Sequence, residues 1–564
     1  MKKRLFMAVL AMMVVATGCG GGKKGSSDAG GATDTSTTVA GTPQPVRGGT
    51  LVVAIGSDPG SLNPAVTSSG VVHPASEMMF NGLVGWGPDG KIAPELATKW
   101  SIEDNGATYR FTLRDGVKWH DGQPFTSDDV KFTFEKALLP FHSRTKASMG
   151  SAGLTLDAPD PLTIVFHFPQ PYAPLLQQLN VTEAPIIPKH VYESCADIST
   201  VAGCPANKTP IGTGPFKLDS YSINEIRMSR NPDYFRAGEP YLDGLVERVI
   251  PDPETQVLAL ENKEVDWLGS VPGPDIARIT KNSALDTAPA PRGSGGGNCI
   301  MTAIFNMKPP AGRTPFFTDL RVRQAVWAAV NRQQAFQNVL FGQGKVADAP
   351  IHSGIVFAHA TGLSLPTFDP ARAATLLDSA GWKQESKGAT RVARGVPNVP
   401  DGTEFKIDWH GFSGDQTTYG EQLRAQLKDV GIDVTVKTED NATLATNVFT
   451  KRDFDLSAAS YCNGDDPEIG VRRQYDSKQI GSTAFSNGAG YSNPQVDTLL
   501  DQGAREADPA KRAPIYRQIQ EIAVHDLPYI WLAETVSLRA FNANCSGFNQ
   551  ENTGLFAEAA FCKK

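Results

Sequence analysis

The sequence lacks the residue patterns of the common hydrolytic and nucleotide-binding sites. Neither G-x-S-x-G nor H-E-x-x-H occurs, and no Walker-type phosphate loop is present, so α/β-hydrolases, zinc peptidases and P-loop proteins are not indicated. Residues 143–146 fit S-x-x-K, but the S-D-N and K-T-G motifs that accompany it in penicillin-recognising enzymes are missing. We therefore expect no catalytic residues and no enzymatic activity.

Clusters of metal-ligating residues are also missing from the sequence. No two cysteines form C-x-x-C, and the nine histidines are scattered without ligand spacing, so no metal site, redox centre or cofactor is expected. A surplus of basic residues is missing as well: 53 Lys and Arg stand against 60 Asp and Glu, which gives a net charge of −7. Nucleic-acid partners need a basic face and are therefore not expected.

The apolar run at the N-terminus is too short to span a membrane. Residues 1–4 are basic, residues 5–16 are apolar, and small residues lead to Cys19, an order that is typical of a secretory signal peptide. A lone Cys at this point resembles the lipobox of bacterial lipoproteins, although Ala16 stands where that motif prefers Leu. We expect removal of residues 1–18 and a lipid anchor on Cys19. The alternative is an ordinary signal peptide with an incidental Cys.

Residues 19–46 predict a flexible tether. They are rich in Gly, Ser, Thr and Ala and cannot bury enough apolar surface to fold. The six cysteines that follow are an even number in an exported chain, which indicates disulfides. Sequence alone leaves their connectivity open; proximity favours Cys195 with Cys204 and Cys545 with Cys562, which leaves Cys299 with Cys462.

Hydrophobic periodicity distinguishes a strand-rich first half of the body from a second half that mixes helices and strands. Strands are predicted over 51–54, 109–113 and 163–168, and helices over 127–138, 319–333 and 370–380. A βαβ unit with parallel strands is predicted from strand 405–409, helix 419–430 and strand 432–436. Glycine-rich residues 293–297 lead into an apolar run, Cys299–Phe305, which predicts a buried strand where the chain crosses between two bodies.

Ordered motifs along this body resemble those of the bacterial extracellular solute-binding proteins, family five, which serve ABC importers of the oligopeptide, dipeptide and nickel group. Residues 96–130, LATKWSIEDNGATYRFTLRDGVKWHDGQPFTSDDV, follow the family signature almost position by position. Further matches follow in order at 212–216, 231–234, 263–266, 321–325, 380–382 and 527–528. The resemblance is collinear from about residue 48 to residue 532 and rests on many motifs together.

The resemblance implies an α/β fold, the two-lobed periplasmic-binding-protein type II fold of the large, peptide-binding class. Lobe one carries an inserted subdomain in such proteins. The corresponding ranges here are 47–84, 205–295 and 530–564 for lobe one, 85–204 for the inserted subdomain, and 296–529 for lobe two.

The loop at 460–468 is the best candidate for contact with a solute. In peptide-binding relatives it reads W-x-x-D-x-x-x-P, and its Asp binds the α-ammonium group of the peptide. Aligned on Pro467, that position is Asn463, so this chain lacks a charge-assisted hydrogen bond of about 1.5–3 kcal/mol unless Asp465 substitutes. The other candidates, each with a structural alternative, are Tyr461, Asp466, Asn306, Arg473, Ser61 and Asn63.

The expected function is that of a lipid-anchored receptor on the extracytoplasmic face of the bacterial membrane. It binds a small peptide or similar polar solute between its lobes, closes about a hinge, and delivers the solute to the permease subunits of an ABC importer. We expect a monomer. The alternatives are a non-peptide solute, such as an oligosaccharide or a metal chelate, and a sensor or surface lipoprotein.

Overall fold

The computed structural model describes residues 44–87, 91–289, 298–412, 414–481, 484–549 and 555–563. The predicted signal peptide, Cys19 and nearly all of the tether lie outside these ranges. No helix within them combines the length and the apolar character that crossing a membrane requires.

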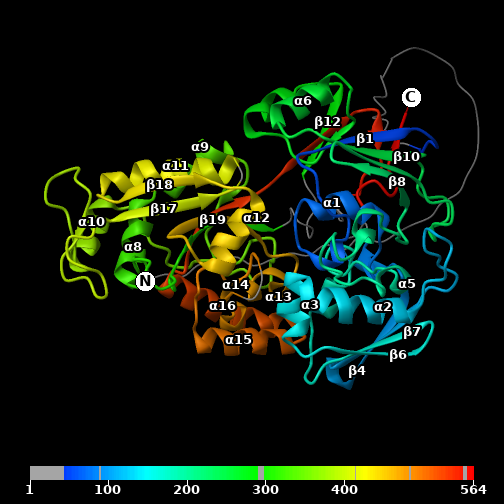
Figure 1. Ribbon diagram of the computed structural model, residues 1–564, viewed down its shortest axis with the longest axis horizontal. Coiled ribbons are helices and arrows are strands. Elements are labelled where there is room, and N and C mark those ends of the chain that lie inside the picture. Colours follow the sequence, from blue (N-terminus) through cyan, green and yellow to red (C-terminus); the bar gives the residue numbers. More distant parts are fainter. Residues whose placement is uncertain are drawn as a thin grey trace, which may run out of the picture. The chain divides into compact units, whose positions relative to one another are not determined.

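A seven-stranded sheet takes its strands from three distant parts of the chain (Figure 1). Its order is β12 (Leu285–Pro289), β21 (Leu538–Asn542), β11 (Trp267–Leu268), β1 (Thr50–Ile55), β10 (Gly244–Val249), β9 (Glu225–Arg230) and β8 (Phe216–Ser222). The central strand β1 is parallel to β10 and β11, and the remaining pairs are antiparallel. We name the body built on this sheet lobe one.

An antiparallel four-stranded sheet lies between β1 and β8 in the sequence. Its order is β4 (Ala97–Glu103), β5 (Thr108–Leu113), β7 (Thr163–His167) and β6 (Thr155–Asp160). Helix α2 (Ser127–Thr133) begins with a reciprocal capping box between Thr126 and Asp129 and continues as the π-helical turn η4 (Phe134–Leu138). The strands and the helix predicted for this region are therefore confirmed.

A six-stranded sheet forms the second body, which we name lobe two. Its order is β14 (Lys345–Val346), β20 (Tyr529–Thr535), β13 (Cys299–Phe305), β19 (Leu456–Cys462), β17 (Lys406–Gly411) and β18 (Asp433–Thr438). All seven residues of β13 are buried, as predicted, because strands pair with both of its edges. The predicted βαβ unit is also present: β17 and β18 are parallel and are joined by α11 (Gly414–Asp429).

The helices of lobe two differ from the prediction at one point. Residues 319–333 form two helices instead of one, α8 (Leu320–Ala329) and α9 (Arg332–Leu340). The break occurs because Val330 is extended and the side chain of Asn331 caps α9 by accepting a hydrogen bond from the Gln334 amide. The other long helices are α10 (Pro370–Ser379), α15 (Pro494–Arg505) and α16 (Pro509–Asp526).

Shorter elements complete the fold. The remaining strands form three small pairs: β2 (Val84–Trp86) with β3 (Ile92–Pro94), β15 (Trp382–Lys383) with β16 (Val392–Ala393), and β22 (Cys545–Ser546) with β23 (Phe561–Cys562). The remaining α-helices are α1 (Val72–Ser76), α3 (Leu139–Phe141), α4 (Ser143–Thr145), α5 (Lys189–Tyr192), α6 (Pro253–Glu261), α7 (Ile276–Ile279), α12 (Asn441–Ala445), α13 (Pro467–Gly470) and α14 (Arg472–Tyr475).

The two lobes are built on different hydrophobic clusters, although Ala504 of α15 belongs to the cluster of lobe one. The lobe-two core contains the buried indoles of Trp327, Trp409 and Trp531. A second core joins the seven-stranded and four-stranded sheets, since Leu51 of β1 and Phe166 of β7 belong to the same cluster. A smaller apolar cluster lies around α6. The inserted sheet is thus attached to lobe one by a continuous apolar core.

The crossings between the lobes occur at β13 and after β20. The predicted start of the returning segment at residue 530 falls inside β20, which pairs with β13 in the lobe-two sheet. The chain enters the lobe-one sheet only at β21, because the pairing of β20 holds it to lobe two up to Thr535.

Three disulfides link the described cysteines: Cys195–Cys204 and Cys545–Cys562, which proximity in the sequence favoured, and Cys299–Cys462, the pair that these two left. Cys299–Cys462 joins directly paired positions of β13 and β19. It therefore fixes the crossing strand to the strand that leads into the 460–468 loop.

Candidate functional site

A cavity of about 680 Å³ lies between lobe-one segments and the start of α11 in lobe two. Its lining in lobe one comes from the end of β1, from α1, from β11 and from the segment before β21. Lobe two contributes Gly414 and Asp415. A small solute of a few residues has a volume in the range that such cavities enclose.

One wall of this cavity is aromatic and apolar. The rings of Trp267 and Phe556 stack with their centres 4.5 Å apart, and Ile55, Val71 and Pro272 also line the space. Burial of an apolar or aromatic side chain against these rings is favourable by about 25 cal/mol for each Å² of apolar surface removed from water.

The cavity lining also contains two polar side chains, those of His73 and Glu77. The Nδ1 atom of His73 lies 2.7 Å from Glu77 Oε1, and Nε2 lies 2.7 Å from the Thr67 carbonyl oxygen. Both residues are buried. An imidazole that faces an oxygen at each nitrogen can donate from both when it is protonated, so this pair places fixed polar groups beside the aromatic wall.

The 460–468 loop lies at the end of β19, and most of its side chains are buried. Tyr461 is fully buried, its hydroxyl donates to the Ser486 carbonyl at 2.8 Å, and its ring packs edge-on against Tyr529. Asn463 is also fully buried: Oδ1 accepts from the His352 amide at 3.0 Å, whereas Nδ2 has no hydrogen-bond partner among the described residues. Asp465 is partly exposed and accepts from Asn298 Nδ2 at 3.4 Å.

Asp466 is placed in a structural role. Its two carboxylate oxygens accept from Arg512 at 2.6 and 2.9 Å, and its side chain caps α13 through the Glu468 amide. Only 1% of the residue is exposed. A bidentate, buried ion pair leaves this carboxylate no free geometry for a solute, in contrast to the sequence expectation.

Asn306 is likewise committed to the fold. Its Nδ2 donates to the carbonyls of Arg452 and Phe454 at 2.8 and 2.7 Å, and its Oδ1 accepts from the Lys308 amide and from Arg452 Nη2. All of its hydrogen-bonding capacity is therefore used within lobe two.

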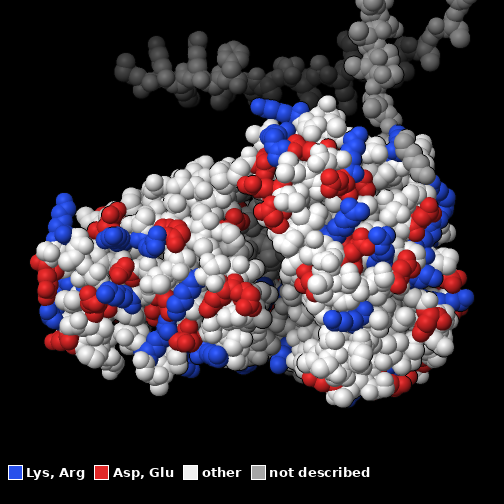
Figure 2. Space-filling view, turned by 45° about the horizontal axis from the view of Figure 1, so that its top comes forward, with Lys and Arg blue, Asp and Glu red and all other residues white. Residues whose placement is uncertain are grey.

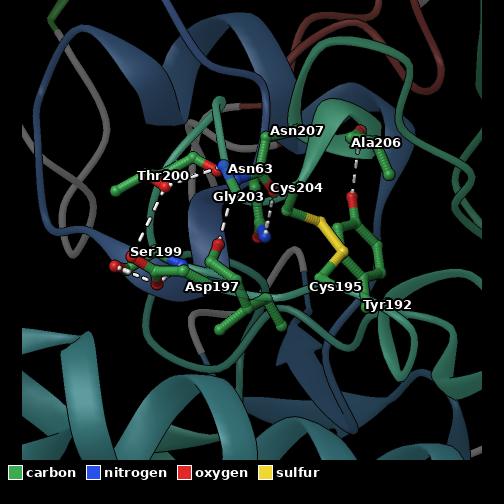
Figure 3. The surroundings of a disulfide bond; sticks show 11 residues. Asn63, Tyr192, Cys195, Asp197, Ser199, Thr200, Gly203, Cys204, Ala206 and Asn207 are labelled. Atoms are coloured by element: carbon green, nitrogen blue, oxygen red, sulfur yellow. Dashed lines mark hydrogen bonds between the residues drawn. A yellow bond between two sulfur atoms is a disulfide. The ribbon is translucent and has the colours of Figure 1, made fainter.

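Asn63 lies close to the Cys195–Cys204 disulfide, and Ser61 is hydrogen-bonded to its backbone. Figure 3 shows Asn63 beside Asn207, whose Oδ1 accepts from Asn63 Nδ2 at 2.9 Å. The Oδ1 atom of Asn63 caps a short 3-10 helix through the Ala65 amide, and Ser61 accepts from the Asn63 amide at 3.3 Å. Asn63 is fully buried, and Ser61 is partly exposed. Among the described residues, neither of them forms a hydrogen bond with the 460–468 loop.

Arg473 is a buried cation that pairs with no carboxylate in the part of the chain that the structure describes. Its guanidinium lies 5.6 Å from the centre of the Tyr461 ring, Nη2 donates to the Cys462 carbonyl at 3.4 Å, and Nε has no hydrogen-bond partner. Burial, together with repulsion from Arg144, lowers the pKa of Arg473 to about 10. The side chain remains charged at neutral pH, and an anionic group would stabilise it.

Within the described residues, Arg473 does not belong to the cavity lining, and it acts on residues of the inserted subdomain through its charge. Arg144 forms an ion pair with Glu183 at 2.7 Å. The rings of His142 and His73 pack edge-on at 5.7 Å, so His142 adjoins a residue that lines the cavity. Burial lowers the pKa of His142 well below its usual value, and the positive charges of Arg144 and Arg473 add to this effect.

The face of the molecule in Figure 2 shows no charged patch that favours a different site. Lys and Arg are interspersed with Asp and Glu over the face shown in Figure 2, without a large patch of one sign. The sequence did not single out His73, Glu77, Trp267 or Phe556 because isolated residues of these types form no motif. The His-x-x-x-Glu spacing at the end of α1 was the one local indication of a polar pair.

Comparison with known proteins identifies the class. Residues 91–482 match the middle part of the bacterial extracellular solute-binding proteins, family 5. Protein XP55 of Streptomyces lividans is 30% identical over 490 residues, which cover 86% of this chain and 83% of that protein. The glutathione-binding protein GsiB of Shigella flexneri is 25% identical over 508 residues, 88% of this chain and 91% of the relative.

Solved structures share the fold. The oligopeptide-binding protein AppA of Bacillus subtilis, solved in complex with a nonapeptide, is similar to this chain with a TM-score of 0.79 at 24% identity. The match covers 92% of this chain and 100% of the AppA chain. The present chain therefore has the two-lobed α/β fold of the type II periplasmic binding proteins. It belongs to the bacterial extracellular solute-binding proteins, family 5.

Proposed function

We propose that this protein is the extracytoplasmic receptor of an ABC importer and that it binds a short peptide in the cavity between the lobes. Family membership supports a receptor instead of an enzyme. The names of relatives support a peptide, since AppA was solved with a nonapeptide and GsiB is named for glutathione. Closure of the lobes on the solute then presents the loaded form to the permease, because a ligand shifts a conformational equilibrium only through contacts that differ between its states.

The single observation that carries the proposal is the buried guanidinium of Arg473, which forms no ion pair among the described residues and is offset only in part by the charge of Glu183, itself paired with Arg144. A buried cation without a directly paired counter-charge is costly, and a carboxylate removes that cost with two parallel hydrogen bonds. The cavity adds an apolar wall at Trp267 and polar groups at His73 and Glu77. A peptide combines the required features: a terminal carboxylate, an apolar side chain and backbone polar groups.

The proposal extends to the ends of the chain and to its organisation. Residues 1–18 are the signal peptide, Cys19 carries the lipid, and residues up to 46 form the tether that holds a monomeric receptor at the membrane surface. The proposed division into lobes follows the sequence prediction, except that the last crossing lies after β20 and not at residue 530. The order of basic, apolar and small residues before Cys19 supports this arrangement.

Calorimetry with a matched set of peptides tests the function. We expect the tripeptide Ala-Phe-Ala to bind with micromolar affinity and its C-terminal amide to bind at least about tenfold more weakly, because the amide cannot form the charged pair with Arg473. Arg473→Gln should remove the difference between the two peptides, whereas Arg394→Gln, which changes an exposed arginine paired with Glu385, should leave it unchanged. If no peptide of two to nine residues binds, the proposal of a peptide receptor is wrong.

A further inference from the structure

A cluster beside the last crossing strand has the composition of a transition-metal site. Asp348, His359 and Glu534 each offer one ligand atom, and these atoms lie within 4.8 Å of one another. The side chains of His359 and Glu534 are 9% and 3% exposed, and that of Asp348 is 56% exposed. One imidazole nitrogen and two carboxylates form a donor set that binds Zn²⁺.

The imidazole of His359 is oriented as a ligand. Its Nδ1 atom lies 2.8 Å from the Ile351 carbonyl oxygen, and a carbonyl only accepts. Nδ1 therefore carries the proton in the neutral ring, and Nε2 holds the lone pair, 3.6 Å from Asp348 Oδ1. A backbone carbonyl that fixes the tautomer in this way is the usual outer partner of a metal-ligating histidine.

Glu534 is fixed by an outer layer of its own. It accepts from the Ser353 amide at 2.9 Å and from the Ser353 hydroxyl at 2.5 Å. His352 is 9% exposed, and its Nε2 atom forms no hydrogen bond with any described residue but lies 3.5 Å from Glu534 Oε2. Because Nδ1 of His352 accepts from the Gly354 amide at 2.9 Å, Nε2 carries the proton and is directed at the carboxylate.

A tethered cation already lies among these acids. The ammonium group of Lys345 is 3.2 Å from Asp348 Oδ1 and 3.5 Å from Glu534 Oε1. The Lys345 side chain is 43% exposed, so the ammonium group can turn into water. The departure of Lys345 leaves two carboxylates facing one neutral imidazole, which is a favourable field for a divalent ion.

We propose that Asp348, His359 and Glu534 bind Zn²⁺ in exchange with the ammonium group of Lys345. Glu534 lies next to Thr535, which pairs with Cys299 of β13 at the other crossing. Bound metal would therefore tie the loop after β14 to the strands that connect the lobes. This inference does not depend on the peptide proposal.

Isothermal titration of the tag-free chain with ZnCl₂, in the absence of peptide, tests the site. We expect one ion per chain, and Co²⁺ should give the visible absorption of a site with nitrogen and oxygen ligands. Asp348→Asn and His359→Ala should each weaken binding about tenfold or more, and Lys345→Met should strengthen it about tenfold or more, because the competing charge is gone. His525→Ala, which changes a largely exposed histidine outside the cluster, is the matched control.

Each outcome decides the proposal. Tighter binding by Lys345→Met together with weaker binding by Asp348→Asn supports it, and Asp348→Asn alters an exposed side chain that the fold does not require. Absence of Zn²⁺ binding by both the wild type and Lys345→Met overturns it. Binding that Asp348→Asn and His359→Ala leave unchanged also overturns it, because the ion is then held elsewhere. A negative result leaves peptide binding by Arg473 untouched, since no peptide is present.

Discussion

Glu247 allows a quantitative test of the lobe-one core. The residue is 1% exposed on β10, in register between Val53 of β1 and Ile226 of β9. Its Oε2 atom has no hydrogen-bond partner in the described part of the chain. Burial raises the pKa of the Glu247 carboxyl to about 8. The native protein therefore holds a proton on this group at neutral pH.

The sign of the pH dependence follows from this pKa. The unfolded chain ionises the carboxyl near its ordinary pKa of 4.5, so between pH 4.5 and about 8 the native state binds more protons at Glu247 than the unfolded state. The contribution of Glu247 to stability is fully present below pH 4.5 and is lost as the pH rises toward 8. With about 1.4 kcal/mol for each pKa unit, the total loss is at most about 5 kcal/mol.

Glu247→Gln removes the titration and keeps the shape of the side chain. We expect denaturant unfolding at about pH 5, 7 and 9 to show a stability advantage of the Gln variant over wild type that grows with pH and reaches about 3–5 kcal/mol at the highest pH. Glu193→Gln changes an exposed carboxylate and serves as the control. A difference between Glu247→Gln and wild type that is the same at all three pH values would refute the reasoning, because the native carboxyl would then be ionised like that of the unfolded chain.

Two further predictions concern the solute and the membrane. Asn463→Asp should raise the affinity for peptides with a free amine by about tenfold or more, since a charge-assisted hydrogen bond replaces a neutral one. Calorimetry with Ala-Phe-Ala and its N-acetylated form measures this change in affinity. Equal affinities of the variant and the wild type for Ala-Phe-Ala would show that the amine does not reach position 463. Cys19→Ser should release the full-length protein from the membrane fraction into the soluble extracytoplasmic fraction, because the anchoring lipid is lost. Immunoblotting of the fractions checks this, and the control variant Cys195→Ser should stay with the membrane. Retention of the Cys19→Ser protein in the membrane fraction would exclude a lipid anchor at this residue.

Part of the fold was predictable because its causes are local in sequence. The apolar run Cys299–Phe305 forms the buried strand β13, the acidic first turn after Thr126 forms α2, and the parallel pair β17 and β18 follows from a strand–helix–strand pattern. The helical prediction failed at Val330, where an extended backbone and the Asn331 cap break a continuous apolar stripe. Periodicity registers the stripe and does not detect the change in backbone direction.

The candidate site was predictable only in outline. Sequence reasoning proposed the 460–468 loop and Arg473, whose role in binding stays a prediction, and it did not single out the cavity wall at Trp267 and Phe556 or the His73–Glu77 pair. Sequence reasoning also could not tell which polar side chains form internal hydrogen bonds or ion pairs and are therefore not free to bind a solute. Asp466, Asn306 and Asn63 are satisfied by Arg512, Arg452 and Asn207 respectively, which are far away in sequence.

The sequence by itself determined the family, the order of most elements and the even set of cysteines, because local patterning and collinear motifs specify these features. Only the tertiary structure decided which side chains are consumed by internal pairs and which face a cavity. The reason is physical: hydrogen-bond satisfaction and burial depend on partners brought together from several segments, and no single stretch of sequence contains those partners.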